Sequence, residues 1–298
     1  MVPNSVCCSI HRGQRLGHRA PVHAAGMVSD LSYTWEFRSC SAVFRLHGND
    51  LAPLELAACR ARVLGWTRTT SSSADVTYAL RRIRPDDQHS MAAPVYELHC
   101  DRSLVRVTPD LEEIVEAFED HAKLETALRA EGRLFVHAGA VSWEGRGIVL
   151  PGRSHAGKTT LVRALVKAGA DYYSDEFAVL DRKGRIHPYA LPLSIRATGT
   201  AQRRRMPVDL VGGRTGVRPV PVDLIVVTEY RAGARWRPRV LSCGQALLAL
   251  MSNTVAARRR PEHSMPILRQ TVLSAKAIHT PRGGDARRTA YALLAELP

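Results

Sequence analysis

The sequence predicts an α/β protein in which a small β-rich domain precedes a larger domain built around a phosphate-binding loop. Residues 152–159 read Gly-Arg-Ser-His-Ala-Gly-Lys-Thr and fit the pattern G-x-x-x-x-G-K-[ST] without a gap. From residue 134 onward, short apolar runs alternate with stretches of helical periodicity, which is typical of a sheet covered by helices. We expect a disordered leader over 1–26, the small domain over 27–107 and the loop-containing domain over 108–298.

Charge and cysteine content limit the class of protein. The 298 residues include 42 Lys and Arg against 28 Asp and Glu, and the net charge of +14 favours anionic partners such as nucleotides or acidic peptides. No apolar stretch has the length of a membrane span, and the six cysteines form no C-x-x-C pair, so we expect a cytoplasmic protein without a membrane segment. The leader contains no acidic residue and no run typical of a signal peptide, which makes Met27 a plausible start.

The small domain is expected to consist of short strands, and a long helix should follow it. Residues 95–98 and 104–107 suggest a hairpin around Asp101 and Arg102. The helix is predicted from residue 108 to about residue 132, with Thr108 as its capping residue and Pro109 in its first turn. Its apolar stripe indicates core packing. The stripe comprises Leu111, Ile114, Val115, Phe118, Ala122 and Leu128.

The loop has the residues that a polyphosphate site requires. Gly152 and Gly157 permit backbone conformations in which successive N–H groups point at phosphate oxygens. Lys158 can reach the β and γ phosphates, and the Thr159 hydroxyl can ligate Mg²⁺, so we expect ATP and Mg²⁺ as cofactors. The flanks fit, because an apolar run at 148–150 precedes the loop and an apolar helical stripe follows it. The predicted nucleotide-binding residues are Gly152, Ser154, Ala156, Gly157, Lys158, Thr159 and Thr160.

A predicted hairpin brings a histidine to this loop. Glu144 and Gly145 resemble a two-residue turn between strands over 136–143 and 146–150. If Trp143 faces Arg146, the register places His137 opposite Gly152, at the mouth of the loop. A histidine there could bind a phosphate or tune a neighbouring acid, or it could simply be satisfied by the backbone at a strand end.

Two carboxylates follow the loop helix. Residues 171–180 predict a second strand, parallel to the first because a helix connects them, with Asp175 and Glu176 together at the carboxyl edge of the sheet. One carboxylate could hold Mg²⁺ while the other accepts a proton from an attacking hydroxyl. The alternative is an acidic turn between two strands.

Three segments together resemble the HPr serine kinase/phosphorylase family, whose catalytic domain is related to phosphoenolpyruvate carboxykinase. They are residues 136–139, which read Val-His-Ala-Gly, the loop over 152–160, and residues 173–176, which read Tyr-Ser-Asp-Glu. The resemblance implies a P-loop kinase domain of the HPr kinase/PEP carboxykinase type that phosphorylates a serine on a protein or small peptide. The roles that it implies are an active-site histidine at His137, phosphate and magnesium residues at Lys158 and Thr159, a catalytic acid/base at Asp175 and a second, metal-binding carboxylate at Glu176. The family's Gly-rich phosphorolysis motif is represented at best by residues 194–196, so we expect an acceptor other than HPr, and a reverse reaction stays open.

The remaining sequence predicts a further buried strand over 222–229 and helices over 244–257, 266–277 and 285–297. Leu247, Leu248 and Met251 should pack inward from the first of these helices. Arg196 could stabilise the charge of a transferring phosphoryl group or lie at the surface. The basic runs 203–205 and 258–260 could be solvated faces or docking sites for an acidic peptide, and without interleaved aromatic residues they make a nucleic-acid partner unlikely.

Two functions from different classes fit these patterns. The first is a kinase that moves the γ phosphate of ATP to a serine-type hydroxyl, with Asp175 as the base. The second is a nucleotide-binding regulatory or assembly module that hydrolyses ATP slowly or not at all. With either function the protein could form a homo-oligomer. An ATP-dependent carboxykinase is a third and weaker option, because the chain is short for that enzyme.

Overall fold

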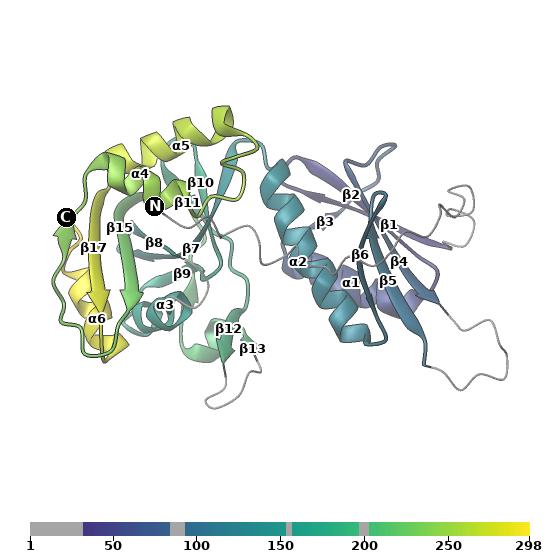
Figure 1. The fold of residues 1–298 in the computed structure, drawn as a ribbon, viewed down its shortest axis with the longest axis horizontal. Helices are drawn as coiled ribbons and strands as arrows, with labels where there is room; N and C mark the ends of the chain where they lie inside the picture. The colour runs from purple at the N-terminus through teal and green to yellow at the C-terminus, as the bar shows by residue number, and fades with distance from the viewer. Residues whose placement is uncertain (1–31, 84–92, 153–156, 197–202) are drawn as a thin grey trace, which may run out of the picture.

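A computed structural model of the chain describes residues 32–83, 93–152, 157–196 and 203–298 (Figure 1). The predicted leader and Met27, like loop residues Ser154 and Ala156, lie outside these ranges. The structure is a mixed α/β protein with an N-terminal part of six strands and two helices and a C-terminal part of strands and helices around a larger sheet, counted over the described ranges. In those ranges no helix is long and apolar enough to cross a membrane.

The N-terminal part is a six-stranded sheet, within the residues that the structure describes, in the order β3-β1-β2-β4-β5-β6. Its strands are β1 (Tyr33–Ser39), β2 (Ala42–Gly48), β3 (Thr67–Arg68), β4 (Val76–Ile83), β5 (Val95–Cys100) and β6 (Ser103–Thr108). The predicted hairpin is confirmed, because Cys100 pairs with Ser103 across the turn. Helix α1 (Leu51–Val63) begins at Asp50, whose side chain accepts a hydrogen bond from the Ala52 N–H.

Helix α2 (Leu111–Arg129) packs on this first sheet. Its capping residue is Asp110, which accepts hydrogen bonds from the N–H groups of Glu112 and Glu113, so the prediction of Thr108 as cap was wrong and Pro109 lies before the helix. The predicted division at residue 107 put this helix with the C-terminal domain. Its inward face instead belongs to the core of the N-terminal sheet. The same core contains Trp66 and Phe44, whose stacked rings have centroids 4.1 Å apart. The buried residues of that face include Ile114, Val115, Phe118 and Ala122.

The C-terminal part is a nine-stranded sheet, counted over the described segments, with helices on both faces (Figure 1). The strand order is β14-β9-β7-β10-β11-β15-β17-β16, and β8 pairs with both β7 and β15. The strands are β7 (Arg133–Trp143), β8 (Arg146–Pro151), β9 (Asp171–Ser174), β10 (Phe177–Asp181), β11 (Arg185–His187), β14 (Arg214–Thr215), β15 (Val220–Tyr230), β16 (Arg239–Val240) and β17 (Lys276–Arg282). A short hairpin of β12 (Leu193–Arg196) and β13 (Arg203–Met206) and the 3₁₀ turn η1 (Asp209–Val211) lie outside this sheet.

Two hydrophobic cores hold the helices against the larger sheet. Helices α3 (Lys158–Lys167) and α6 (Ala286–Leu294) contribute Leu161, Leu165 and Leu293 to one core. Helices α4 (Cys243–Met251) and α5 (Pro261–Ser274) contribute to the other core, which lies on the opposite face in Figure 1. The predicted apolar stripe after the loop is therefore confirmed as a packing face.

Three predicted elements differ from the structure. Residues 171–180 form two strands instead of one, because β9 and β10 are separated by a break at 175 and 176. Both pair antiparallel with β7, as β8 does, so they run in the same direction as β8, as predicted. The helix predicted over 266–277 ends at Ser274, and β17 begins two residues later. In α4, Leu248 is 58% exposed, whereas Ala246 and Leu250 are the buried residues.

Candidate functional site

The hairpin of β7 and β8 brings His137 to the start of the loop, as the sequence predicted. Glu144 and Gly145 both have positive φ at the turn, and Trp143 pairs with Arg146. The register continues to Ala138 opposite Pro151. One residue further, the Gly152 N–H lies 3.5 Å from the carbonyl oxygen of His137.

The loop leads from β8 into α3. Gly157 is the residue before the helix and has a φ of 79°, a left-handed conformation that glycine adopts without strain. Among the described residues no side chain caps this helix, so the N–H groups of its first turn are available to an anion. The Nζ of Lys158 donates a hydrogen bond to the carbonyl oxygen of Gly152 at 2.7 Å, so this side chain lies back across the loop. Thr160, the last predicted loop residue, is exposed.

Two basic side chains are desolvated here. Burial lowers the pKa of Lys158 to about 8, against the attraction of Asp175 and Glu176. Burial also lowers the pKa of His137 to about 4, and the positive charge of Lys158 lowers it further. His137 is therefore neutral at pH 7, and a bound phosphate would return to both groups part of the interaction energy that they lost with water.

Asp175 is joined to the loop. The Thr159 hydroxyl donates a hydrogen bond to Asp175 Oδ2 at 3.0 Å. The Tyr172 hydroxyl lies 2.9 Å from Asp175 Oδ1 and 2.8 Å from the carbonyl oxygen of Leu191. Asp175 is only 7% exposed, and burial raises the pKa of its carboxyl although both hydroxyl groups lower it. A buried carboxylate that contacts the first turn of α3 is suited to accept a proton.

The carboxylate of Glu176 contacts helix α2. The Nζ of Lys123 in α2 lies 3.1 and 3.3 Å from the two carboxylate oxygens of Glu176. Lys123 is 7% exposed and also lies 2.8 Å from Asp120, and these carboxylates raise its pKa despite burial. Both acids lie in the bend between β9 and β10, where Asp175 contacts Thr159 and Tyr172 while Glu176 contacts Lys123, so the two acids that the sequence placed together have different partners. The Ser174 hydroxyl fixes the break by accepting hydrogen bonds from the N–H groups of Glu176 and Phe177.

A magnesium site at this position would contain few protein ligands. Among the residues that the structure describes, no group of three or more His, Cys, Asp or Glu side chains could hold a metal ion. Mg²⁺ in a nucleotide site is commonly held by one or two protein oxygens, with phosphate and water completing the octahedron. The oxygens of Thr159 and Asp175, 3.0 Å apart, fit that requirement. The metal role predicted for Glu176 stays a prediction.

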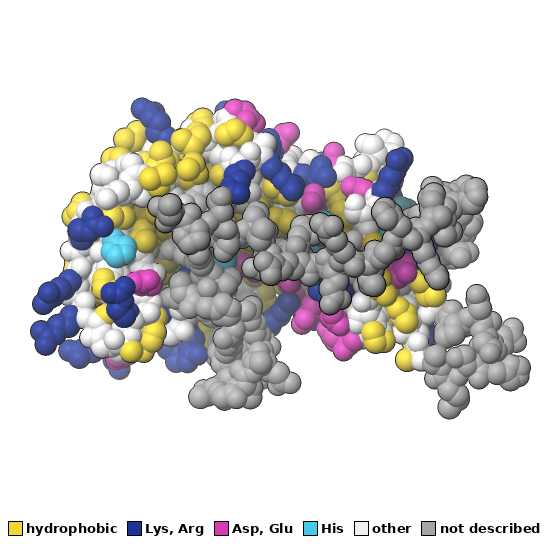
Figure 2. Space-filling model, in the orientation of Figure 1, with side chains coloured by type: hydrophobic (Ala, Val, Ile, Leu, Met, Phe, Trp, Pro, Cys, Tyr) yellow, Lys and Arg dark blue, Asp and Glu magenta, His cyan; other side chains and the backbone are white. Residues whose placement is uncertain are grey.

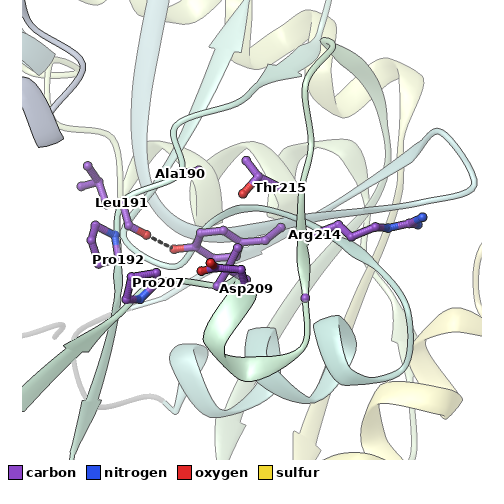
Figure 3. Close-up of a pocket in the computed structure, with 10 residues that line it drawn as sticks. Ala190, Leu191, Pro192, Pro207, Asp209, Arg214 and Thr215 are labelled. Carbon is purple, nitrogen blue, oxygen red and sulfur yellow. Dashed lines mark hydrogen bonds between the residues drawn. The ribbon is translucent and has the colours of Figure 1, made fainter.

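Tyr172, which contacts Asp175, also lines a cavity of about 320 Å³. Figure 3 shows the residues around this cavity. The tyrosine ring forms one wall, and its hydroxyl contacts the Leu191 carbonyl. The other lining residues are Ala190, Leu191, Pro192, Pro207, Val208, Asp209, Gly213, Arg214 and Thr215. The wall is mainly apolar, with Asp209 and Arg214 as its charged members.

Sequence reasoning missed three side chains at this site. The sequence predicts Tyr172 only as part of a strand, although its position three residues before Asp175 could have indicated a contact between the two side chains. Lys123 carried no signal, because its partner is 53 residues away. Arg282, whose Nη2 donates a hydrogen bond to the carbonyl oxygen of Gly157 at 3.0 Å, is 125 residues from its partner. For Arg196 the structure gives the backbone position, in β12.

Comparison with known proteins adds little to this geometry. No family model matches the chain, and no curated protein matches it. Among solved structures, the HPr(Ser) kinase/phosphatase from Coxiella burnetii is similar at 15% identity, over 54% of this chain and 85% of that chain, with a TM-score of 0.29. A TM-score of this size does not establish a common fold, so the functional argument rests on the residues themselves.

Surface charge agrees with an anionic ligand. In Figure 2, Lys and Arg side chains are spread along the outer edge of the C-terminal part. With a net charge of +14 for the whole chain, this surface favours the approach of a polyanion.

Proposed function

We propose that the protein is an ATP-dependent kinase that transfers the γ phosphate to a serine-type hydroxyl of a protein or peptide. The hydrogen bond between Thr159 and Asp175 carries the proposal. It joins the phosphate-binding loop to a buried carboxylate, the two groups that must lie together for phosphoryl transfer to a hydroxyl.

The loop supplies the nucleotide site in this proposal. The N–H groups at the start of α3 and the ammonium of Lys158 bind the β and γ phosphates, and neutral His137 hydrogen-bonds a phosphate oxygen from the opposite side of the loop. Mg²⁺, when bound with ATP at Thr159, neutralises phosphate charge. Lys158 and His137 have both lost solvation to the protein, and this supports an anionic ligand at their position.

Asp175 supplies the acid/base chemistry. The serine oxygen forms a bond to the γ phosphorus while the bond between that phosphorus and the bridging oxygen of ADP breaks. The proton of the serine hydroxyl passes to the Asp175 carboxylate and then to solvent. Thr159 and Tyr172 hold the carboxylate in position, one at each oxygen.

One observation favours the nucleotide-binding module as a second candidate. The carboxylate of Glu176 is held by Lys123, whereas the kinase proposal derived from the sequence needs it at the metal. A module that binds ATP without transferring phosphate needs no second carboxylate at that position.

The test is transfer of labelled γ phosphate from ATP to a library of serine-containing peptides. We expect the unaltered protein to label peptides and Asp175→Asn to lower the rate by about 10²-fold to 10⁴-fold, while the ATP dissociation constant stays within about threefold. Asparagine keeps the shape of the side chain and an oxygen for the Thr159 hydroxyl, so the loop should be preserved. The control is Asp171→Asn, which removes the same charge four residues earlier, in β9, at a residue that pairs with Arg214.

The outcomes separate the two candidates. Labelling that is lost in Asp175→Asn and kept in Asp171→Asn supports the kinase. Equal labelling by the unaltered protein and Asp175→Asn would refute the assigned base. ATP binding that needs Lys158, without labelling of any peptide, would favour the nucleotide-binding module.

A further inference from the structure

Three adjacent parallel strands end at the edge of the sheet where the loop begins. Strand β8 pairs with β15, and β15 pairs with β17, both in parallel, and Figure 1 shows β15 and β17 running side by side. The loop follows β8, while β15 ends at Tyr230 and β17 ends at Arg282, and these two residues pair in register. Ligands of open α/β sheets bind at the carboxyl ends of their strands. The ends of β15 and β17 are thus candidates for contact with a ligand that is held by the loop.

Arg282 is a buried cation at this edge. It is only 4% exposed, and its Nη2 donates a hydrogen bond to the carbonyl oxygen of Gly157. Its Nε is buried without a hydrogen-bond partner, and over the described part of the chain its guanidinium forms no ion pair with a carboxylate. A buried charge without an anion is costly, and its presence beside a phosphate-binding loop is explained if the anion is the ligand.

Its surroundings hold Arg282 in one position. The Arg231 N–H donates a hydrogen bond to the Arg282 carbonyl oxygen at 2.8 Å. The next residue, Gly283, packs so tightly that a Cβ would lie 2.5 Å from the Ala234 nitrogen. A Cβ on Gly157 would lie 1.9 Å from Arg282 Nη2, so the guanidinium occupies the space beside the end of the loop.

Tyr230 offers an aromatic surface next to this cation. The Arg282 guanidinium lies 5.3 Å from the centroid of the Tyr230 ring, and the tyrosine is 55% exposed. Two residues earlier in β15, the Thr228 hydroxyl is buried and has no hydrogen-bond partner among the described residues. Within the described ranges, the last residues of β15 and β17 thus carry an exposed ring, a cation without a carboxylate partner and a hydroxyl without a hydrogen-bond partner.

We propose that Tyr230 and Arg282 form the nucleoside side of the nucleotide site, with the base stacked on Tyr230 and with Arg282 fixing the end of the phosphate-binding loop. The inference rests on the nucleotide binding proposed above and not on phosphate transfer. Aromatic rings bind nucleobases through their faces, which explains the exposure of Tyr230. Arg282 is a positioning residue, since its contact is with the Gly157 carbonyl and its charge adds to the field that attracts the phosphates.

The two residues should affect different ligands. Tyr230 would contact only the base, so its loss should weaken the binding of ATP and leave the affinity for inorganic tripolyphosphate unchanged. Arg282 would act on the loop and on the phosphates, so its loss should weaken both. A purely structural role for the pair would lower the stability of the unliganded protein without distinguishing ATP from tripolyphosphate.

The experiment is titration of the full chain with ATP and with tripolyphosphate, each with Mg²⁺. We expect Tyr230→Ala to weaken ATP binding about tenfold and to leave the affinity for tripolyphosphate within about twofold of that of the unaltered protein. Arg282→Gln should weaken both ligands at least about tenfold, and Arg282→Lys should recover part of the loss because it keeps the charge without the planar fork. The matched control is Tyr291→Ala in α6, a 51% exposed tyrosine with the Arg287 guanidinium 5.9 Å from its ring centroid.

Each result has a distinct meaning. Equal ATP affinity in the unaltered protein and Tyr230→Ala would overturn the inference and leave the proposed kinase intact. Equal weakening of ATP and tripolyphosphate by Tyr230→Ala would also overturn it, because the effect would then be on the loop. Failure of the unaltered protein to bind either ligand would overturn both proposals. If Arg282→Gln does not fold, Tyr230→Ala and Arg282→Lys still decide.

Discussion

Replacing Lys158 by methionine should make the unliganded protein more stable while removing nucleotide binding. Burial lowers the pKa of this lysine from 10.5 to about 8, which corresponds to roughly 3 kcal/mol against the protonated form at about 1.4 kcal/mol per pH unit. The side chain is partly exposed, so solvent screening reduces that figure, and the hydrogen bond to Gly152 offsets about 1 kcal/mol more. We expect a net gain of about 1 kcal/mol in the free energy of unfolding of Lys158→Met at pH 7.

The pH dependence gives this prediction its sign. Below pH 8 the lysine is protonated in both the folded and the unfolded chain, so the folded protein bears the full cost of the buried charge. Between about pH 8 and 10.5 the folded protein releases its proton first, and the unaltered protein gains stability relative to the variant. The advantage of Lys158→Met should therefore shrink between pH 7 and pH 10.

The assay is urea unfolding of both proteins without nucleotide at pH 7 and pH 10, with an ATP titration at pH 7. The control is Lys167→Met, at the exposed end of the same helix, which should change neither the pH dependence nor ATP binding. A Lys158→Met variant that is less stable at pH 7, or whose advantage grows with pH, would show that the lysine is not held at a cost in the unliganded protein.

Three further predictions concern the same site. Gly157→Ala should lower the free energy of unfolding by about 1–2 kcal/mol for its left-handed backbone alone, and the contact with Arg282 should distort the loop, so urea unfolding and ATP titration should both change. Lys123→Met should lower the free energy of unfolding by about 1–3 kcal/mol, because it leaves Glu176 without its partner, and an unchanged urea midpoint would argue against that ion pair. His137, with a pKa near 4, should show no titration by NMR between about pH 5.5 and 8, and a midpoint near the ordinary value of 6.5 would mean that the ring is solvated.

Local patterns were enough to predict several elements of this protein. The hairpin register that places His137 beside Gly152 follows from the two-residue turn at Glu144 and Gly145. The strand predicted over 222–229 lies within β15, and the stripe after the loop packs as expected. In each case the deciding interactions join residues close in sequence, or depend only on the alternation of apolar and polar side chains.

The sequence did not predict the features that depend on contacts between residues far apart in the chain. The sequence showed that two carboxylates follow the loop helix, but the direction of each side chain was set by partners. Thr159 holds Asp175 at the loop, while Lys123 of α2 holds Glu176 away from Asp175. The same helix packs on the N-terminal sheet, because its apolar face fits a core formed by residues far from it in the chain.

The sequence by itself thus determined the strand and the helix on either side of the loop, and the chemical types of the residues near them, because these features are encoded within short segments. Only the tertiary structure decided which acid lies at the loop and which buried arginine contacts the end of the loop. Arg282 reaches Gly157 only because β17 lies beside β15, and β15 beside β8. Pairing between strands that are far apart in the chain depends on the packing of the whole sheet, so no local pattern around Arg282 could have predicted that contact.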